Sequence, residues 1–98
     1  ITSVDDKDLT AKGYYLSQNY PNPFNPLTNI DFQMAEDGYV KISIYNLMGQ
    51  KIKDIINDFR KAGSYSIMLN ALELPSGIYF YTMTANNFSQ TRKLILLK

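Results

Sequence analysis

The sequence contains no cysteine and no histidine. Their absence excludes disulfide frameworks, thiolate nucleophiles, the common zinc clusters and Ser-His-Asp catalysis. No apolar run approaches the roughly 20 residues that a membrane-spanning helix needs. Ten basic and nine acidic residues leave a net charge of +1, so the strong positive field on which nucleic-acid binding depends is also missing.

The residues that are present have the number and composition of one globular domain. Of 98 residues, 45% are hydrophobic and 19% are charged, a balance too apolar for intrinsic disorder. No nucleotide-binding or metalloprotease motif occurs. The carboxylates stand beside Gly, Asn or Lys at predicted strand ends and turns, rather than within the apolar runs that favour acid–base catalysis. We therefore expect no enzymatic activity, and no catalytic, cofactor-binding or metal-binding residue.

From Tyr14 onward, apolar and polar residues alternate with a period of two. Successive side chains of a strand point to opposite faces, so each run buries one face, as in antiparallel sheets. The pattern predicts seven strands, at Tyr14–Ser17, Thr28–Met34, Tyr39–Asn46, Lys51–Ile56, Ser64–Leu69, Ile78–Ala85 and Thr91–Leu97. Seven short strands in about 100 residues are typical of an all-β fold, the immunoglobulin-like antiparallel β-sandwich.

Turn residues separate these runs. Asp37-Gly38 lies between the second and third runs and predicts a tight hairpin. The run Lys51–Ile56 also fits a helix, because its isoleucines and Phe59 would share one helical face. The neighbouring strands and the turn signal at Asn57-Asp58 favour a strand.

The first segment differs in composition from the rest. Residues Ile1–Gly13 are charged and have few apolar anchors, which is typical of a linker. Asp5, Asp6 and Asp8 lack the glycine and distal glutamate of a calcium loop, which favours a solvated acidic tether. Because the chain opens at Ile1 rather than Met, we expect a piece of a longer precursor. Residues 1–13 would then tether an upstream cargo domain to a sandwich of residues 14–98.

Two internal segments are unusual. Tyr20–Pro26 holds three of the four prolines, whose fixed φ makes a stiff, non-helical crossover. We expect its two aromatic residues to cap one end of the sandwich rather than to line a ligand groove. In Pro75–Tyr81 a glycine precedes a strand on which Tyr79 and Tyr81 share one face. We expect this face to pack across strands or to provide a tyrosine corner, rather than to stack on sugars from the outside.

The final segment, Lys93–Lys98, contains four consecutive apolar residues that do not alternate with polar ones. If one pair faces the core, the other pair faces outward. Either a neighbouring segment covers the second face, or a partner recognises the strand by strand addition or in a groove. Arg92, Lys93 and Lys98 flank the strand and are expected to discourage uncontrolled edge pairing.

In this order and at these separations, the segments resemble the C-terminal sorting domains of type IX secretion cargo. The resemblance is carried by Leu16–Phe32, Val40–Gln50, Ala62-Gly63, Leu74–Tyr81 and Lys93–Lys98. The first of these is also similar to the immunoglobulin-like domain of flagellar hook-capping proteins. By match of motif, the marked positions are Pro21, Asn22, Pro23, Phe24, Gly77, Tyr79, Lys93, Leu94, Ile95, Leu96, Leu97 and Lys98.

The resemblance implies a function. Such domains stand last in large exported proteins of certain Gram-negative bacteria, where the outer-membrane translocon recognises the folded domain. In many members a sortase-like peptidase then removes the domain and attaches the cargo to surface lipopolysaccharide; here the cut would fall in Ile1–Gly13. We therefore expect a sorting module of a secreted or cell-surface protein. The alternative is a carbohydrate- or protein-binding immunoglobulin-like module that uses Tyr79 and Tyr81.

Overall fold

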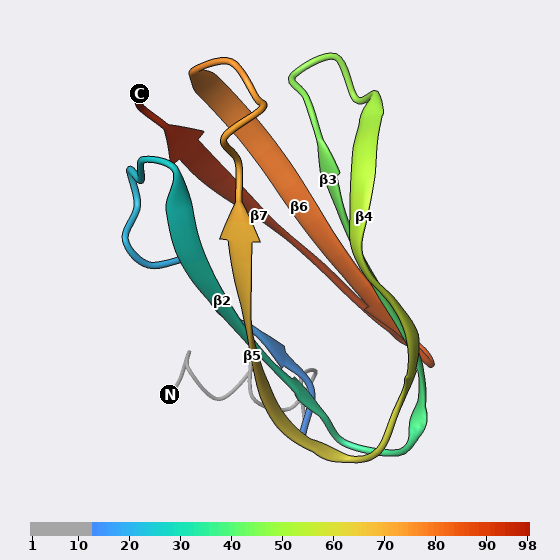
Figure 1. The fold of residues 1–98 in the computed structure, drawn as a ribbon. Coiled ribbons are helices and arrows are strands. Elements are labelled where there is room, and N and C mark those ends of the chain that lie inside the picture. The colour runs from blue at the N-terminus through green and yellow to red at the C-terminus, as the bar shows by residue number, and fades with distance from the viewer. Residues whose placement is uncertain (1–12) are drawn as a thin grey trace, which may run out of the picture.

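A computed structural model describes residues 13–98 as seven strands and no helix. They form two antiparallel sheets in the orders β1-β2-β5 and β4-β3-β6-β7, which Figure 1 shows as the two layers of a sandwich. The predicted all-β sandwich of about seven strands is confirmed. The strands are β1 (Tyr15–Leu16), β2 (Leu27–Met34), β3 (Gly38–Tyr45), β4 (Lys51–Arg60), β5 (Gly63–Asn70), β6 (Gly77–Ala85) and β7 (Phe88–Leu96).

The core lies between the sheets and follows the period-two pattern. In β2, Ile30, Phe32 and Met34 are buried while the residues between them are exposed or half-buried. The inward residues of β3, β6 and β7 meet them from the other sheet. No helix able to cross a membrane is found among residues 13–98. The predicted tether, with Asp5, Asp6 and Asp8, lies almost wholly outside the described residues.

The predicted hairpin at Asp37-Gly38 is wrong. Strand β2 pairs with β1 and β5, whereas β3 pairs with β4 and β6, so the short link between β2 and β3 crosses from one sheet to the other. The β4–β5 link crosses beside it, and the Ala62 N–H donates to Asp37 Oδ1 at 2.7 Å. A link of this length is compatible with either arrangement, and the pairing partners of the strands decide between them.

Strand β4 runs to Arg60, so the turn signal at Asn57-Asp58 was misleading. Its pairing with β3 shifts register twice, because Ile42 faces Ile56 while Ser43 faces Asp54, and a second shift follows. Each such bulge adds a residue to one strand and breaks the alternation of side chains. The bulges therefore explain why the isoleucines of this strand also matched a helical face.

Strand β7 begins at Phe88, three residues before the predicted start at Thr91. Asn86 takes a left-handed φ of 51° in the predicted turn, and β6 and β7 then pair without interruption from Ala85 and Phe88 onward. Figure 1 shows the C-terminus, the loop before β2, the β3–β4 turn and the loop before β6 gathered at one end of the sandwich.

Candidate functional site at the end of the last strand

The structure shows which apolar residues of β7 face the core. Leu94 and Leu96 are fully buried, Ile95 is half-buried, and Leu97 is 56% exposed. Lys93 is exposed as well. The run of four apolar residues thus splits into a buried pair and an outward pair, as its alternating geometry requires.

The proline-rich block closes the outer edge of this strand. Phe24 is buried and lies beside Leu96 in a parallel bridge. The Phe24 N–H donates to the Ile95 carbonyl at 3.0 Å, and the Leu97 N–H donates to the Phe24 carbonyl at 3.0 Å. The Ile95 N–H donates to Asn22 Oδ1 at 2.9 Å. The side chain of Asn22 therefore takes the place that a backbone carbonyl of a further strand would occupy.

The expectation that two aromatic residues of the block cap the sandwich holds for Phe24 but fails for Tyr20, which is 80% exposed. All three X-Pro peptide bonds of the block are cis. Pro21 and Pro23 are exposed, and the carbonyl of Pro21 accepts from the hydroxyl of buried Thr28 at 2.8 Å. The block is thus anchored to β2 on one side and to β7 on the other.

Two further contacts join the start of the sandwich to β7, and no sequence motif singles out Gln18, which makes the first of them. Gln18 Nε2 donates to the Lys93 carbonyl at 2.6 Å. Arg92 Nε donates to the Leu16 carbonyl at 2.9 Å. Arg92 therefore points toward the first sheet and links the two layers, whereas Lys93 faces outward. Only Lys93 of these two has the exposure expected of a charge that guards an edge.

Gly77 and Tyr79 lie directly opposite the last strand. Gly77 pairs with Leu96 and has a φ of +154°, which other residues rarely adopt. Tyr79 pairs with Leu94, and its hydroxyl donates to the Pro75 carbonyl at 2.6 Å. A tyrosine near the start of a strand that bonds to the backbone a few residues upstream is a tyrosine corner. Burial raises the pKa of Tyr79 above its ordinary value.

The expectation that Tyr79 and Tyr81 pack inside the sandwich is confirmed, because both side chains are buried, and the alternative of an outer platform for sugars is wrong. The Tyr81 hydroxyl donates to the Ser17 carbonyl at 2.6 Å, and burial raises the pKa of Tyr81 to about 12. The residues of β6 that face outward here are Ile78 and Phe80. The tyrosines therefore hold the sheets together and leave an apolar surface outside.

The chain beyond β7 is tied to the loop before β6. The Lys98 N–H donates to Ser76 Oγ at 3.0 Å, and Lys98 Nζ donates to the Leu72 carbonyl at 2.5 Å. Leu72 is 63% exposed. On the outer face of the sheet, Ile78 lies opposite Ile95 in register.

An exposed apolar surface therefore surrounds the last residues of β7. A shallow hollow of about 270 Å³ adjoins it, lined by the β3–β4 turn and the loop before β6. Leu47 and Met48 of that turn are both largely exposed. We call Ile78, Lys93, Ile95, Leu97 and Lys98 the terminal surface.

These features define a class of protein: a small β-sandwich whose last strand is fixed by the chain's own loops. The comparison with known families is more specific. The family model described as "Secretion system C-terminal sorting domain" matches residues 18–97, so the chain belongs to this family. No curated protein matches the chain.

Membership of this family defines what the chain does. It is a C-terminal sorting signal for type IX secretion, and it serves a cargo polypeptide that is secreted through the outer membrane. The family is one of sorting signals and is not known as enzymatic. The matched range includes the proline-rich block and Lys93 through Leu97, the segments that the structure brings into contact.

Proposed function

We propose that the export machinery recognises this chain through the terminal surface. The observation that carries the proposal is the closed edge of β7. Because Asn22 and Phe24 occupy the outward backbone groups of Ile95 and Leu97, an added strand has no free partner there. Leu94 and Leu96 are buried, so a partner can reach this end of the strand through the outward side chains alone.

The chemistry of the terminal surface indicates which kind of surface the partner must have. Two isoleucines and a leucine are flanked by Lys93 and Lys98, both exposed. A complementary surface would offer an apolar centre with carboxylates at its rim. We propose that a component of the outer-membrane translocon presents this surface in a Gram-negative host.

We further propose that a sortase-like peptidase cuts within Ile1–Gly13 and attaches the cargo to surface lipopolysaccharide. The arrangement of the sandwich is compatible with both events. Gly13 lies against Ala35, just beyond the end of β2, whereas Lys98 contacts Leu72, near the start of β2. Eight strand residues span about 27 Å, so a partner at the terminal surface leaves the other end accessible.

The experiment fuses the chain behind a signal peptide and a reporter in a type IX-competent host. Leu97→Asp and Lys93→Glu change exposed side chains and leave the buried leucines intact. We expect both variants to accumulate reporter in the periplasm, while the unchanged chain exports it. Deletion of residues 94–98 is less informative, because it removes two buried core residues and unfolds the domain as well.

Thr84→Asp is the matched control. Thr84 is exposed on the same outer face, at the far end of β6. We expect normal export from this variant and unchanged thermal unfolding from all three. Normal export of Leu97→Asp and Lys93→Glu would contradict the assignment of the terminal surface, although the sorting function itself would stand.

A further inference from the structure

The sheet edges differ in how they are protected. The edge of β7 is closed by the proline-rich block over its last residues, and β4 carries two bulges together with Lys51, Lys53, Asp54, Asp58 and Arg60. Bulges and charges are the usual devices that prevent an edge from pairing with another chain. Strand β5 has none of them. It contains no charge and no proline, and its eight residues pair with β2 in unbroken register.

The open side of β5 presents regularly spaced backbone groups. Asn29 and Asp31 direct their backbone groups toward the residues that follow β1, where they bond to Tyr20 and Ser17. In an antiparallel ladder these directions alternate, so Ile30 and its alternate neighbours face β5. The N–H and C=O groups of Ser64, Ser66 and Met68 consequently point away from β2. Within the part of the chain that the structure describes, no hydrogen bond to these groups is found.

We propose that β5 is a self-association edge that pairs antiparallel with β5 of a second copy, Ser66 opposite Ser66. In this register Ser64 lies opposite Met68 of the second copy, so all the outward groups of these three residues are satisfied. The two copies are then related by a two-fold axis perpendicular to the sheet, so the core-facing surfaces of both copies lie on the same face of the joined sheet. The result is one continuous six-stranded sheet across the two copies.

Side chains favour this register. Tyr65 would lie opposite Ile67 of the second copy, and Ile67 opposite Tyr65, which makes two pairs of an aromatic and a β-branched residue. Both residues are only half-buried in the single chain, so pairing would cover them further. Strand β5 itself brings no charge to the contact. The one charged side chain over Tyr65 is that of Arg60, and it enters the contact paired with Asp58.

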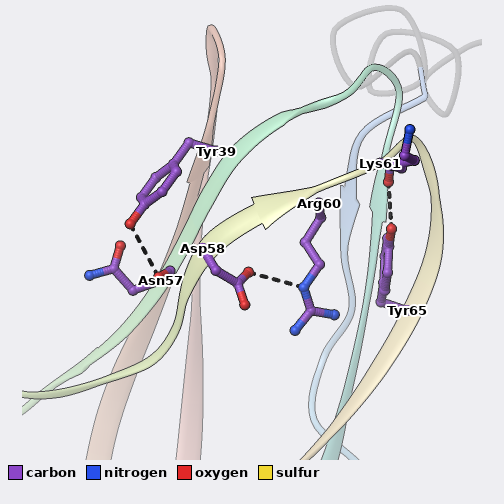
Figure 2. A network of polar contacts seen from close by, with 6 residues as sticks. All are labelled: Tyr39, Asn57, Asp58, Arg60, Lys61 and Tyr65. Atoms are coloured by element: carbon purple, nitrogen blue, oxygen red, sulfur yellow. Dashed lines mark hydrogen bonds and ion pairs between the residues drawn. The ribbon is translucent and has the colours of Figure 1, made fainter.

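The side chain of Tyr65 is already fixed in position by its neighbours in the single chain. Its ring stacks on Phe32 at 5.1 Å, and its hydroxyl donates to the Lys61 carbonyl at 2.5 Å. Arg60 lies over the ring at 5.0 Å and is paired with Asp58 at 3.0 Å, so its charge is offset (Figure 2). The ring therefore has a fixed position, which reduces the conformational entropy lost on pairing.

The test uses the absence of cysteine from the chain. In the proposed register, two Ser66→Cys residues would have Cα atoms about 5.5 Å apart, within disulfide reach. Two Ser64→Cys residues, on the same face of the same strand, would be about 13 Å apart and out of reach. Under mild oxidation we expect Ser66→Cys to form disulfide-linked dimers at least about tenfold faster than Ser64→Cys. Equal rates, or a faster Ser64→Cys, would overturn the register.

A second measurement tests the association without a cross-link. The mass of the unchanged chain in sedimentation should rise from one chain toward two with concentration, while the amides of Ser64, Ser66 and Met68 become protected from exchange. Ser66→Pro removes an outward N–H and no bond to β2, so this variant should remain monomeric. If the unchanged chain stays monomeric, or if these amides are already protected at high dilution, the proposal is wrong.

Discussion

Asn22→Ala tests the closed edge of β7 directly. The substitution removes the side-chain oxygen that accepts the Ile95 N–H at 2.9 Å and leaves the two backbone bonds of Phe24 in place. A single hydrogen bond of this kind contributes about 1 kcal/mol. For 98 residues, the entropy of unfolding is about 0.2 kcal/mol/K, so the melting temperature should fall by about 5 °C.

The local effect is the more specific readout. Because 1.4 kcal/mol corresponds to a factor of ten, a loss of about 1 kcal/mol should accelerate exchange of the Ile95 amide about fivefold. The amide of Val40, buried in β3, reports global opening and should change only with overall stability. Residue-resolved hydrogen exchange measures both amides in one experiment.

Asn22→Asp is the matched control, since a carboxylate has the same shape and keeps an acceptor at the same place. We expect near-normal exchange at Ile95 in this variant. If Asn22→Ala left the exchange of Ile95 unchanged, Asn22 would not close the edge. If Asn22→Asp were as damaging as Asn22→Ala, the acceptor would not be the reason for the loss.

Three further predictions concern side chains that hold the sandwich together. Tyr79→Phe removes the bond to the Pro75 carbonyl and should lower the free energy of unfolding by about 1 kcal/mol in denaturant titration. Tyr81 has its pKa raised to about 12 by burial, above its ordinary 10.0. Its contribution to stability is therefore full below pH 10 and is lost as the pH rises toward 12, so Tyr81→Phe should show a shallower loss in alkaline unfolding monitored by circular dichroism. The Ser43 hydroxyl, at 2.6 Å, followed by Lys51, lowers the pKa of Asp54 below 3.8. Its contribution to stability is present above pH 3.8 and is lost as the pH falls through the lower folded value; Ser43→Ala should raise the pKa of Asp54 in a carboxyl NMR titration.

The sandwich itself could be predicted because a half-buried strand imposes a period of two on its residues. Ile30, Phe32 and Met34 carry this signal, and all three are buried. Five of the seven strands begin and end within one residue of the alternating runs, whereas β4 ends four residues later than its run and β7 begins three residues earlier. Strand β4 departs from the pattern because bulges break the alternation, and such bulges are visible only once the register with β3 is known.

The two faces of β6 show a different limit of prediction from sequence. Alternation places Tyr79 and Tyr81 on one face and Ile78 and Phe80 on the other, but it does not say which face is inside. A hydroxyl often prefers the surface, yet both tyrosines point inward because each hydroxyl finds a backbone carbonyl, those of Pro75 and Ser17. Burial of a polar group is permitted when it is hydrogen-bonded. The carbonyl partners are positions in the fold, so local sequence could not reveal them.

The closed edge of β7 could not be predicted either, because it too depends on residues that only the fold brings together. Asn22 and Ile95 are 73 residues apart in the chain, and the bond between them exists only when β2 and β7 lie in their places. The proline-rich block at the start of the domain and the apolar segment at its end are therefore parts of one structural feature, although a sequence presents them as separate motifs. A partner that binds the outward side chains of Ile95 and Leu97 therefore binds only when the sandwich has closed around Phe24. On this argument, recognition at the terminal surface distinguishes a folded domain from an unfolded chain of the same sequence.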